Sequence, residues 1–326
     1  MLMGERRAIK KFATGLITTD FPRFPRPPFS GSGWKVSYRV DAHQHCSAVV
    51  GKRIYRGREI VIHARTKVVA QKVIGLIHAA MVLLWNDPMI ANLFWTVEDA
   101  ADQKQSIGEG EKPLFQISTG DLPLGCLIAR KVSKRRHLVY ALHKFLLSCQ
   151  IYSPDVRSLD PAERVHYSPS QFADDHVRFA YAIIAAYSVV EELRLEVRVS
   201  KEHPQSQVNG QWEAAVKADL EKRLRDSRVS LSERVLWHLR GTPTRLERVR
   251  QPKSQGKASW AHGRVRDCQM EVVDAIARAS WLRSKISSHR LTQRVTSLSA
   301  YEVANVQHLA RRLLLEHLGF WKYNFK

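Results

Sequence analysis

A polar stretch at residues 153–170, interrupted by three prolines, separates two parts of the chain that have different sequence patterns. Proline cannot donate the backbone hydrogen bond that a helix or a central strand needs, so Pro154, Pro161 and Pro169 exclude one continuous element across this stretch. Before it, strand-like and helix-like patterns alternate, and after it a long run of helical pattern begins. We therefore expect two domains, at residues 1–155 and 156–326, which a chain of 326 residues accommodates.

The first domain is predicted to mix strands and helices. Prolines crowd the segment at residues 21–28, which favours an extended arm or surface loop, and the chain before residue 34 is expected to be irregular. The composition of residues 34–40 and 59–64 favours strands, with a turn at residues 55–58. Two strongly apolar helices are predicted at residues 67–85 and 137–152.

The second domain is predicted to be an all-helical bundle. The run Ser168-Pro169-Ser170-Gln171 has the form of a helix start, and apolar residues recur after it at steps of three and four. Ser-x-x-Glu boxes at Ser230 and Ser299 mark two further helix starts. Residues 241–263 lack periodicity and are rich in Arg and Lys, which predicts a basic loop. The later helices are predicted at residues 212–225, 230–239 and 265–286, and from Ser299 toward the end of the chain. The fold class is thus α+β, a mixed α/β domain followed by a helical bundle.

The longest apolar run, at residues 68–85, contains Gln71, Lys72 and His78 and falls short of the roughly 18 uncharged apolar residues that a membrane span needs. No apolar segment with a small-residue cleavage site follows the basic N-terminus, so no signal peptide is predicted. The four cysteines are Cys46, Cys126, Cys149 and Cys268. Their wide spacing favours buried reduced thiols over disulfides or a zinc knuckle. We expect a cytoplasmic protein without membrane contact.

The charge balance predicts a polyanionic partner. The chain has 52 Lys and Arg against 31 Asp and Glu, a formal net charge of +21 at pH 7. Such a surplus attracts nucleic acid, an acidic membrane surface or an acidic protein. The charge is mostly arginine dispersed through segments with folded patterns, rather than a basic amphipathic helix or a juxtamembrane lysine cluster. Nucleic acid is therefore the leading expected partner, and much of the excess charge lies between Lys222 and Arg294.

An arginine interrupts the apolar stripe of the helix predicted at residues 265–286. The stripe consists of Val265, Cys268, Val272, Ile276, Ala279 and Ile286. Arg283 occupies the position that completes its spacing, and burying a guanidinium is costly unless it is paired or faces a polar cleft. We expect Arg283 to line a groove or a subunit interface. The alternative is a structural arginine that reaches solvent or bridges to Glu191 or Glu192.

A histidine follows this arginine at a spacing of Arg-x5-His, in the run Arg283-Ser284-Lys285-Ile286-Ser287-Ser288-His289. In a regular helix six residues turn the chain by about 600°, which leaves the two side chains about 120° apart. The pair can converge only where the helix bends or ends. Ser287 and Ser288, which are poor residues for a helix interior, predict such a bend or end.

This motif at the end of a bundle helix resembles the signature of HEPN-domain ribonucleases, and among them the ApeA-type branch linked to abortive infection. In that branch an aromatic or apolar pair precedes Arg-Ser, as Trp281-Leu282 does here. Residues 186–193 resemble the opening helix of the domain and residues 310–314 its closing helix, so the resemblance covers about residues 171–318. Where many members have Asn, His or Asp after the arginine and Gly after the histidine, this chain has Ser284 and Arg290.

The resemblance implies an endoribonuclease that needs no metal and no other cofactor. RNA carries its own nucleophile in the 2′-hydroxyl, so cleavage needs a base, an acid and a cation near the phosphorane. His289 can act as base or acid near neutral pH, and Arg283 can hold a phosphate oxygen. Ser284 either donates to phosphate, orients Arg283, or is a tolerated helix residue. One histidine cannot easily be acid and base at once, and the resemblance implies a homodimer whose twofold axis brings two copies into one cleft. The basic residues expected to bind RNA nearby are Lys285, Arg290, Arg264, Arg266 and Lys257.

Two other groups of residues are weaker candidates. Arg311 or Arg312 with His317 has a similar spacing, but an unbroken helix would point the two side chains to different faces. The segment from Asp41 to Cys46 contains ligand-type side chains, yet no second His/Cys cluster completes a zinc site. No metal is therefore expected.

The leading hypothesis is a cytoplasmic endoribonuclease acting on single-stranded RNA, with a sensor or targeting domain and a HEPN-like nuclease domain, in a defence or toxin setting. The alternative is a catalytically silent HEPN module that binds RNA or a partner protein as a subunit of a larger defence complex. A sequence-specific DNA-binding protein has only the charge in its favour, because no helix-turn-helix spacing or zinc finger is present. In a toxin, residues 1–155 or the basic loop at 241–263 would restrain the site.

Overall fold

The computed structural model of the chain describes residues 8–19, 28–39, 47–50, 53–85, 88–93, 95–99, 122–154, 173–205, 211–240, 265–287, 298 and 300–322. The chain divides into two compact units, and the division lies inside helix α4 (Arg136–Ile151), between Leu142 and His143. The N-terminal unit comprises residues 1–85, 89–142 and 322–326. The C-terminal unit comprises residues 86–88 and 143–321. Most of the proline-containing stretch that predicts the boundary lies outside the described residues.

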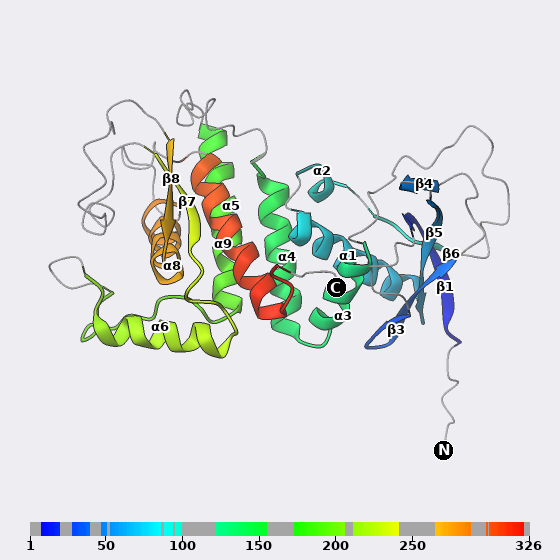
Figure 1. Cartoon of the computed structure of the whole chain (residues 1–326), viewed down its shortest axis with the longest axis horizontal. Helices are drawn as coiled ribbons and strands as arrows, with labels where there is room; N and C mark the ends of the chain where they lie inside the picture. Colours follow the sequence, from blue (N-terminus) through cyan, green and yellow to red (C-terminus); the bar gives the residue numbers. More distant parts are fainter. Residues whose placement is uncertain are drawn as a thin grey trace, which may run out of the picture. The chain divides into compact units, whose positions relative to one another are not determined.

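The N-terminal unit contains an antiparallel sheet with helices on one face (Figure 1). Its strands are β1 (Lys10–Thr19), β2 (Phe29–Gly31), β3 (Trp34–Arg39), β4 (Ser47–Val50), β5 (Arg53–Ala64) and β6 (Glu98–Asp99). The helices up to the division are α1 (Lys67–Trp85), α2 (Pro88–Ala91), α3 (Leu122–Val132) and the first part of α4. The order across the sheet is β2-β3-β5-β1-β6, and β4 pairs with the first residues of β5.

The two faces of this sheet differ in character because side chains alternate along each strand. Phe12, Val36 and Ile62 lie opposite one another on β1, β3 and β5, and all three are almost fully buried. Helix α1 packs against these three strands and covers that face. The neighbouring positions Lys11 and Lys35 are exposed, so the opposite face carries basic side chains.

Helix α1 spans the residues predicted for it, and it is the one helix in the described part of the chain that is long and apolar enough to cross a membrane. Its polar residues bond within the protein. His78 Nε2 lies 2.6 Å from the carbonyl oxygen of Ile90, and the Gln71 amide bonds the backbone of Trp95 and Val97 at 2.7 and 3.2 Å. Most of α1 is buried, as expected of a core helix.

Two predictions for this unit are wrong. Residues 10–19 form strand β1 rather than an irregular segment, because Phe12 and Leu16 are buried and the strand pairs along β5. Residues 55–58 lie within β5 rather than in a turn. The first four residues of β5 pair with β4 and the rest pair with β1, and β3 pairs from Glu59 onward. These partners override the turn preference of Gly57.

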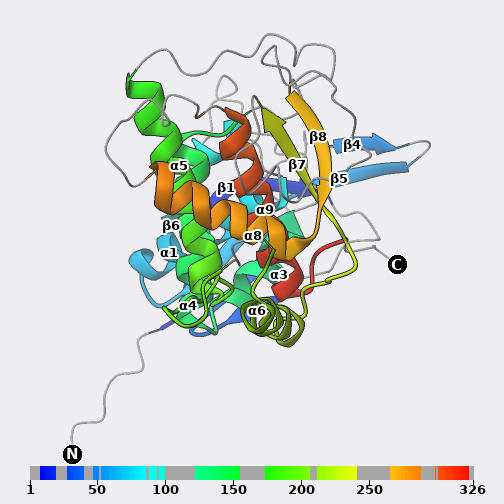
Figure 2. The ribbon, with the colours of Figure 1, turned by 90° about the vertical axis from the view of Figure 1, so that its left-hand side faces the viewer.

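The C-terminal unit contains the second part of α4 and a group of elements around α5 and α9. These elements are α5 (Ala173–Glu192), α6 (Ala214–Asp226), β7 (Val235–Arg240), β8 (Val265–Met270), α8 (Val272–Trp281), the π-helix η4 (Leu282–Ser287) and α9 (Ala300–Leu318). Figure 2 shows α8 crossing α5 and α9, with the paired strands β7 and β8 beside them. Helices α5, α6 and α9 confirm the helices predicted in these regions.

The all-helical prediction for this part is wrong, whereas the described residues as a whole combine helices with antiparallel strands and are compatible with the predicted α+β class. In place of the helix predicted at residues 230–239, residues 235–240 form strand β7, and β8 occupies the first six residues of the helix predicted at 265–286. The side-chain amide of Asn305 on α9 accepts from the N–H of His238 and donates to its C=O, both at 2.7 Å. Because β8 and Asn305 satisfy the backbone of β7, tertiary contacts decide its conformation.

The Ser230 box has a different role from the one predicted. The backbone N–H of Glu233 donates to Ser230 Oγ at 3.3 Å, but the chain continues into strand β7 instead of a helix. Such serine-closed turns use the same local hydrogen bond as a helix cap, so the motif alone does not distinguish the two. Among the helices of this unit, α6 is capped by Glu213, whose carboxylate accepts from the N–H of Val216 at 2.9 Å.

Candidate functional site

Arg283 lies in the π-helix η4, which follows α8 without a break. The buried stripe of α8 consists of Val272, Ile276 and Ala279, as predicted, whereas the predicted stripe residues Val265 and Cys268 lie in β8. Regular α-helix ends at Trp281, before Arg283 and before Ser287, where the bend was expected. Single π-helical turns are frequent at functional sites because they change the direction in which side chains point.

The Arg283 guanidinium forms an ion pair with Glu191 of α5, with Nη2 3.3 Å from Oε1. This is the bridging contact that was considered as the alternative for Arg283. The two side chains are 41% and 35% exposed, so the pair lies at the surface of the unit and not in its core. The next residue of α5, Glu192, forms a second ion pair, with its Oε1 2.7 Å from Lys144 Nζ of α4. The neighbouring carboxylates of α5 are therefore each held by a cation.

Tyr187 lies one turn before Glu191 on α5 and is 3% exposed. Its hydroxyl is hydrogen-bonded to the side chain of Ser280 on α8. Burial raises the pKa of Tyr187 to about 12; Glu191 and Glu196 raise it further, and the Ser280 hydrogen bond and Arg283 oppose the rise. Tyr187 is therefore protonated at neutral pH, and its contact with Ser280 connects α5 to α8.

The hydroxyl of Ser284 forms a hydrogen bond within its own helix. Its Oγ donates to the carbonyl oxygen of Ser280 at 2.8 Å, four residues earlier in the chain. A serine that bonds back in this way satisfies its hydroxyl locally and often accompanies a bend in the helix. Of the three roles considered for Ser284, the observed bond supports that of a tolerated helix residue at the change from α8 to η4.

We call Tyr187, Glu191, Ser280, Arg283 and Ser284 the Arg283 cluster. The structure brings Arg283 and Ser284 of the predicted site together with three residues from α5 and α8. Tyr187 and Ser280 were not predicted as site residues. The sequence gives one weak signal for Tyr187, which stands four residues before Glu191 and so shares its face of α5.

The other predicted site residues fall into two groups. His289, Arg290, Arg264 and Lys257 lie outside the described residues. Lys285 and Arg266 are placed in η4 and β8 through their backbone. Within the described part of the chain, the site is therefore the Arg283 cluster on η4, α8 and α5.

The rival arginine, Arg312, is a structural residue. It is 1% exposed, and its Nε donates to Glu316 at 2.9 Å on the next turn of α9. Its Nη2 donates to the carbonyl oxygens of Ser230 and Glu233 at 3.1 and 2.9 Å. These bonds attach the segment that leads into β7 to the side of α9. Because the side chain is 1% exposed and its Nε and Nη2 donate to groups of the same chain, Arg312 is not positioned to hold a substrate phosphate.

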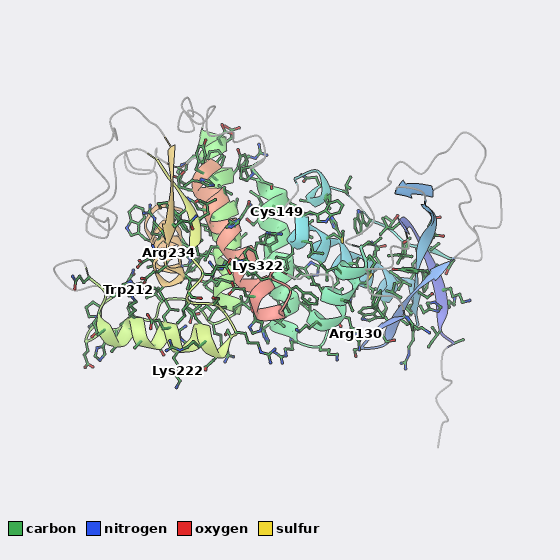
Figure 3. All side chains as sticks on the ribbon, in the orientation of Figure 1. Arg130, Cys149, Trp212, Lys222, Arg234 and Lys322 are labelled. Carbon is green, nitrogen blue, oxygen red and sulfur yellow. The ribbon has the colours of Figure 1, made fainter. Side chains whose placement is uncertain are left out.

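Among the residues that the structure describes, no group of three or more His, Cys, Asp and Glu side chains could hold a metal ion. The ligand-type segment from Asp41 to Cys46 lies outside the described residues. Cys126 and Cys149 are buried thiols outside any disulfide, and burial raises the pKa of each thiol to about 12. Cys149 lies among the helices of the C-terminal unit (Figure 3). The prediction of buried thiols is confirmed for these two.

The arrangement makes Arg283 accessible to an anion. A surface ion pair whose two side chains are each about a third or more exposed contributes about 0–1 kcal/mol, because water screens both charges. A phosphate that offers two oxygens to the guanidinium can compete with a contact of this strength. The sequence matches no model of a known protein family, and no curated protein and no solved structure is significantly similar to it.

Proposed function

We propose that the protein is a metal-independent endoribonuclease of HEPN type that cleaves single-stranded RNA. The observation that carries the proposal is the position of Arg283. The buried stripe of α8 leads directly to a half-exposed guanidinium on a π-helix, and His289 follows it at the spacing of the motif. An arginine at a surface break in a core helix is suited to a ligand, since packing does not require it there.

In the proposed reaction the 2′-oxygen of one ribose attacks the adjacent phosphorus. His289 takes the proton from the 2′-hydroxyl as the O2′–P bond forms. The bond from phosphorus to the 5′-oxygen then breaks, and that oxygen receives a proton from the His289 of the second protomer. The products are a 2′,3′-cyclic phosphate and a free 5′-hydroxyl. Arg283 holds the non-bridging oxygens of the phosphorane, where negative charge accumulates.

Glu191 has a defined part in this scheme. In the absence of RNA it holds the Arg283 guanidinium over α5 at 3.3 Å, which limits the orientations that the arginine side chain samples. When phosphate binds, the guanidinium releases the Glu191 carboxylate and binds the phosphate instead. The loss of the ion pair costs about 0–1 kcal/mol. Tyr187 of α5 interacts with Ser280 of α8 and with the charges of Glu191 and Arg283.

The wider setting follows from the resemblance and the charge. The proposal assigns the enzyme to the cytoplasm as a homodimer or a subunit of a larger defence complex, where it acts as an antiviral toxin. Its net charge of +21 gathers RNA around the site, and Lys285, Arg290, Arg264, Arg266 and Lys257 are the residues assigned to that role. Residues 1–155 restrain or target the nuclease.

The test is cleavage of a mixed single-stranded RNA pool in EDTA by purified variants. His289→Ala is expected to lower the rate by about 10²–10⁴-fold, the usual contribution of general acid–base catalysis. Arg283→Ala is expected to lower it by about 10²–10³-fold, as for a group that stabilises transition-state charge. The matched controls are His203→Ala and Arg225→Ala, which remove an exposed histidine and an exposed, glutamate-paired arginine elsewhere in the same unit. Wild-type rates in the His289→Ala variant would contradict the proposal.

A second candidate function is a catalytically silent module that binds RNA or a partner protein. The ion pair between Arg283 and Glu191 favours it, because that contact gives Arg283 a partner within the chain. The same assay separates the two functions. A silent module binds RNA in the wild-type protein and in the His289→Ala variant alike, and neither protein releases products.

A further inference from the structure

Basic and hydroxyl side chains form one row across four strands of the N-terminal sheet. The row follows the strand order β2, β3, β5, β1 and consists of Ser30, Lys35, His63 and Lys11. Residues directly opposite each other in antiparallel strands place their side chains on the same face. Lys11 and Lys35 are exposed and His63 is half-buried between them. We call these four residues the sheet row.

The sheet row lies on the face away from helix α1. Phe12, Val36 and Ile62 occupy the adjacent register positions on the same three strands and are buried toward the helix side. Because side chains alternate, Lys11, Lys35 and His63 point to the other side of the sheet. In Figure 1 the helices α1 and α3 lie on one side of β1, β3 and β5.

The lysines of the row lack acidic partners in the part of the chain that the structure describes, where neither Lys11 nor Lys35 forms an ion pair. Glu98 of β6 is on the same face, opposite Ala13 and diagonal to Lys11, and it is exposed. Glu59, two register positions from His63 on that face, is buried and accepts from the backbone N–H of Thr14 at 3.2 Å. Two carboxylates thus share this face, but within the described residues neither lysine is held in an ion pair, so both ammonium groups stay open to an anion.

The centre of the row is a histidine held in place by a hydroxyl. Ser37 Oγ lies 2.6 Å from His63 Nε2, which fixes the ring between the two lysines. Burial, together with Lys11 and Lys35, lowers the pKa of His63, so the ring is neutral at pH 7. Lys11 and Lys35 flank this ring from the two strands beside β5. An anion bound between the two lysines would offset their mutual repulsion and favour the protonated ring.

We propose that the sheet row of Ser30, Lys35, His63 and Lys11 binds the phosphodiester backbone of a single RNA strand and so docks the substrate on the N-terminal unit. The ligand is taken as RNA because of the proposed function, and the contacts themselves are to phosphate. Lysine binds phosphate as a point charge, and the hydroxyl of Ser30 at the end of the row can donate to a further phosphate oxygen.

A strand fits the row better than a single phosphate group does. Neighbouring strands lie about 4.8 Å apart, so the backbones of β3 and β1 that carry Lys35 and Lys11 are separated by about 10 Å. One phosphate is too small to satisfy both lysines together with the hydroxyl at the far end of the row, whereas successive phosphates of one strand can. The aromatic Trp34 is buried on the opposite face, so the row offers charge and not base stacking, and binding is expected to be independent of sequence.

The test uses the full chain with His289→Ala, so that RNA is not consumed, and a fluorescent single-stranded RNA of about 12 nucleotides, within the length that such surfaces cover. Lys11→Gln/Lys35→Gln removes two charges from the row. Lys10→Gln/Lys72→Gln is the matched control, because Lys10 is the neighbour of Lys11 on the other face of β1 and Lys72 is exposed on α1. Lys11→Arg/Lys35→Arg keeps the charge. Fluorescence anisotropy measures affinity as salt is varied.

Each phosphate contact to single-stranded nucleic acid contributes about 0.7 to the slope of log affinity against log salt concentration. Losing two contacts should reduce the slope by about 1.4 and weaken binding at about 0.1 M salt by roughly 25-fold. The control pair should stay within about twofold, and the arginine pair should bind as the parent does. Equal affinities for the row variant and the control would overturn the proposal, as would a mononucleotide binding as tightly as the strand. This outcome is independent of cleavage, because binding alone is measured.

Discussion

The buried pair of Arg312 and Glu316 gives the sharpest prediction about stability. Replacing Arg312 by Met removes the partner of a glutamate whose side chain is 5% exposed. It also removes the donor that reaches the carbonyl oxygens of Ser230 and Glu233. Breaking a buried pair from one side costs about 3–5 kcal/mol, because the remaining carboxylate stays buried without its counter-charge and keeps only the N–H of Ser230, 2.8 Å from Oε2.

The contrast with Arg283 makes this prediction informative. Its pair with Glu191 is about one-third to two-fifths exposed, so Arg283→Met should change the stability of the unit by about 0–1 kcal/mol. Two arginines with similar spacing to a histidine are thus expected to differ in stability cost by several kcal/mol. The difference separates a residue that the fold needs from one that is available for a ligand.

Native-state hydrogen exchange of peptides from α9 measures this without assuming that the two units unfold together. A loss of 3–5 kcal/mol lowers amide protection in Arg312→Met by about two to nearly four powers of ten, whereas Arg283→Met should lower it by less than one. The double variant Arg312→Met/Glu316→Leu should recover part of the loss, since both charges are then gone. Equal protection in the two single variants would refute the reasoning.

Three further predictions concern the C-terminal unit. Arg228 follows α6 with a φ of 63°, and the N–H of the next residue, Val229, donates to the carbonyl oxygen of Leu224. Glycine adopts this left-handed conformation without strain, so Arg228→Gly should stabilise the unit by about 1 kcal/mol in urea unfolding. No gain would argue against strain at this position. Burial lowers the pKa of His308 from 6.5 to about 4, helped by Arg311, His238 and Arg312, so stability is complete above pH 6.5 and falls by about 3 kcal/mol as the pH drops to 4. His308→Gln should lack that slope. Asn305→Ala leaves both backbone groups of His238 in β7 unpaired and should cost about 2–4 kcal/mol, measured by exchange in β7; a cost below about 1 kcal/mol would show that water replaces the amide.

Local pattern was sufficient for the helices whose packing follows their own periodicity. Helix α1 begins and ends at the predicted residues, because its apolar run is long and the polar side chains within it are few. The same holds for the stripe of Val272, Ile276 and Ala279 on α8. Buried apolar area of this kind dominates the choice of conformation, so the sequence alone predicts it.

Prediction failed where a distant residue decides. Strand β7 depends on Asn305, which is far away in the chain. In β8, Val265 and Cys268 are three residues apart, which is also a helical spacing, so they were wrongly assigned to the stripe of a helix. The site shows the same limit. Arg283 was found from the break in its stripe, but the bond between Tyr187 and Ser280 joins two helices and has no local signature.

The central claim is that RNA is cleaved through its own 2′-hydroxyl at the site marked by Arg283 and His289. The most direct measurement is the chemical identity of the ends formed when the wild-type protein is incubated with RNA in EDTA, beside the same strand carrying 2′-deoxyribose. The account predicts 2′,3′-cyclic phosphate and 5′-hydroxyl ends from RNA and no cleavage of the deoxy strand. Ends that carry 3′-hydroxyl and 5′-phosphate, or equal cleavage of the deoxy strand, would contradict it.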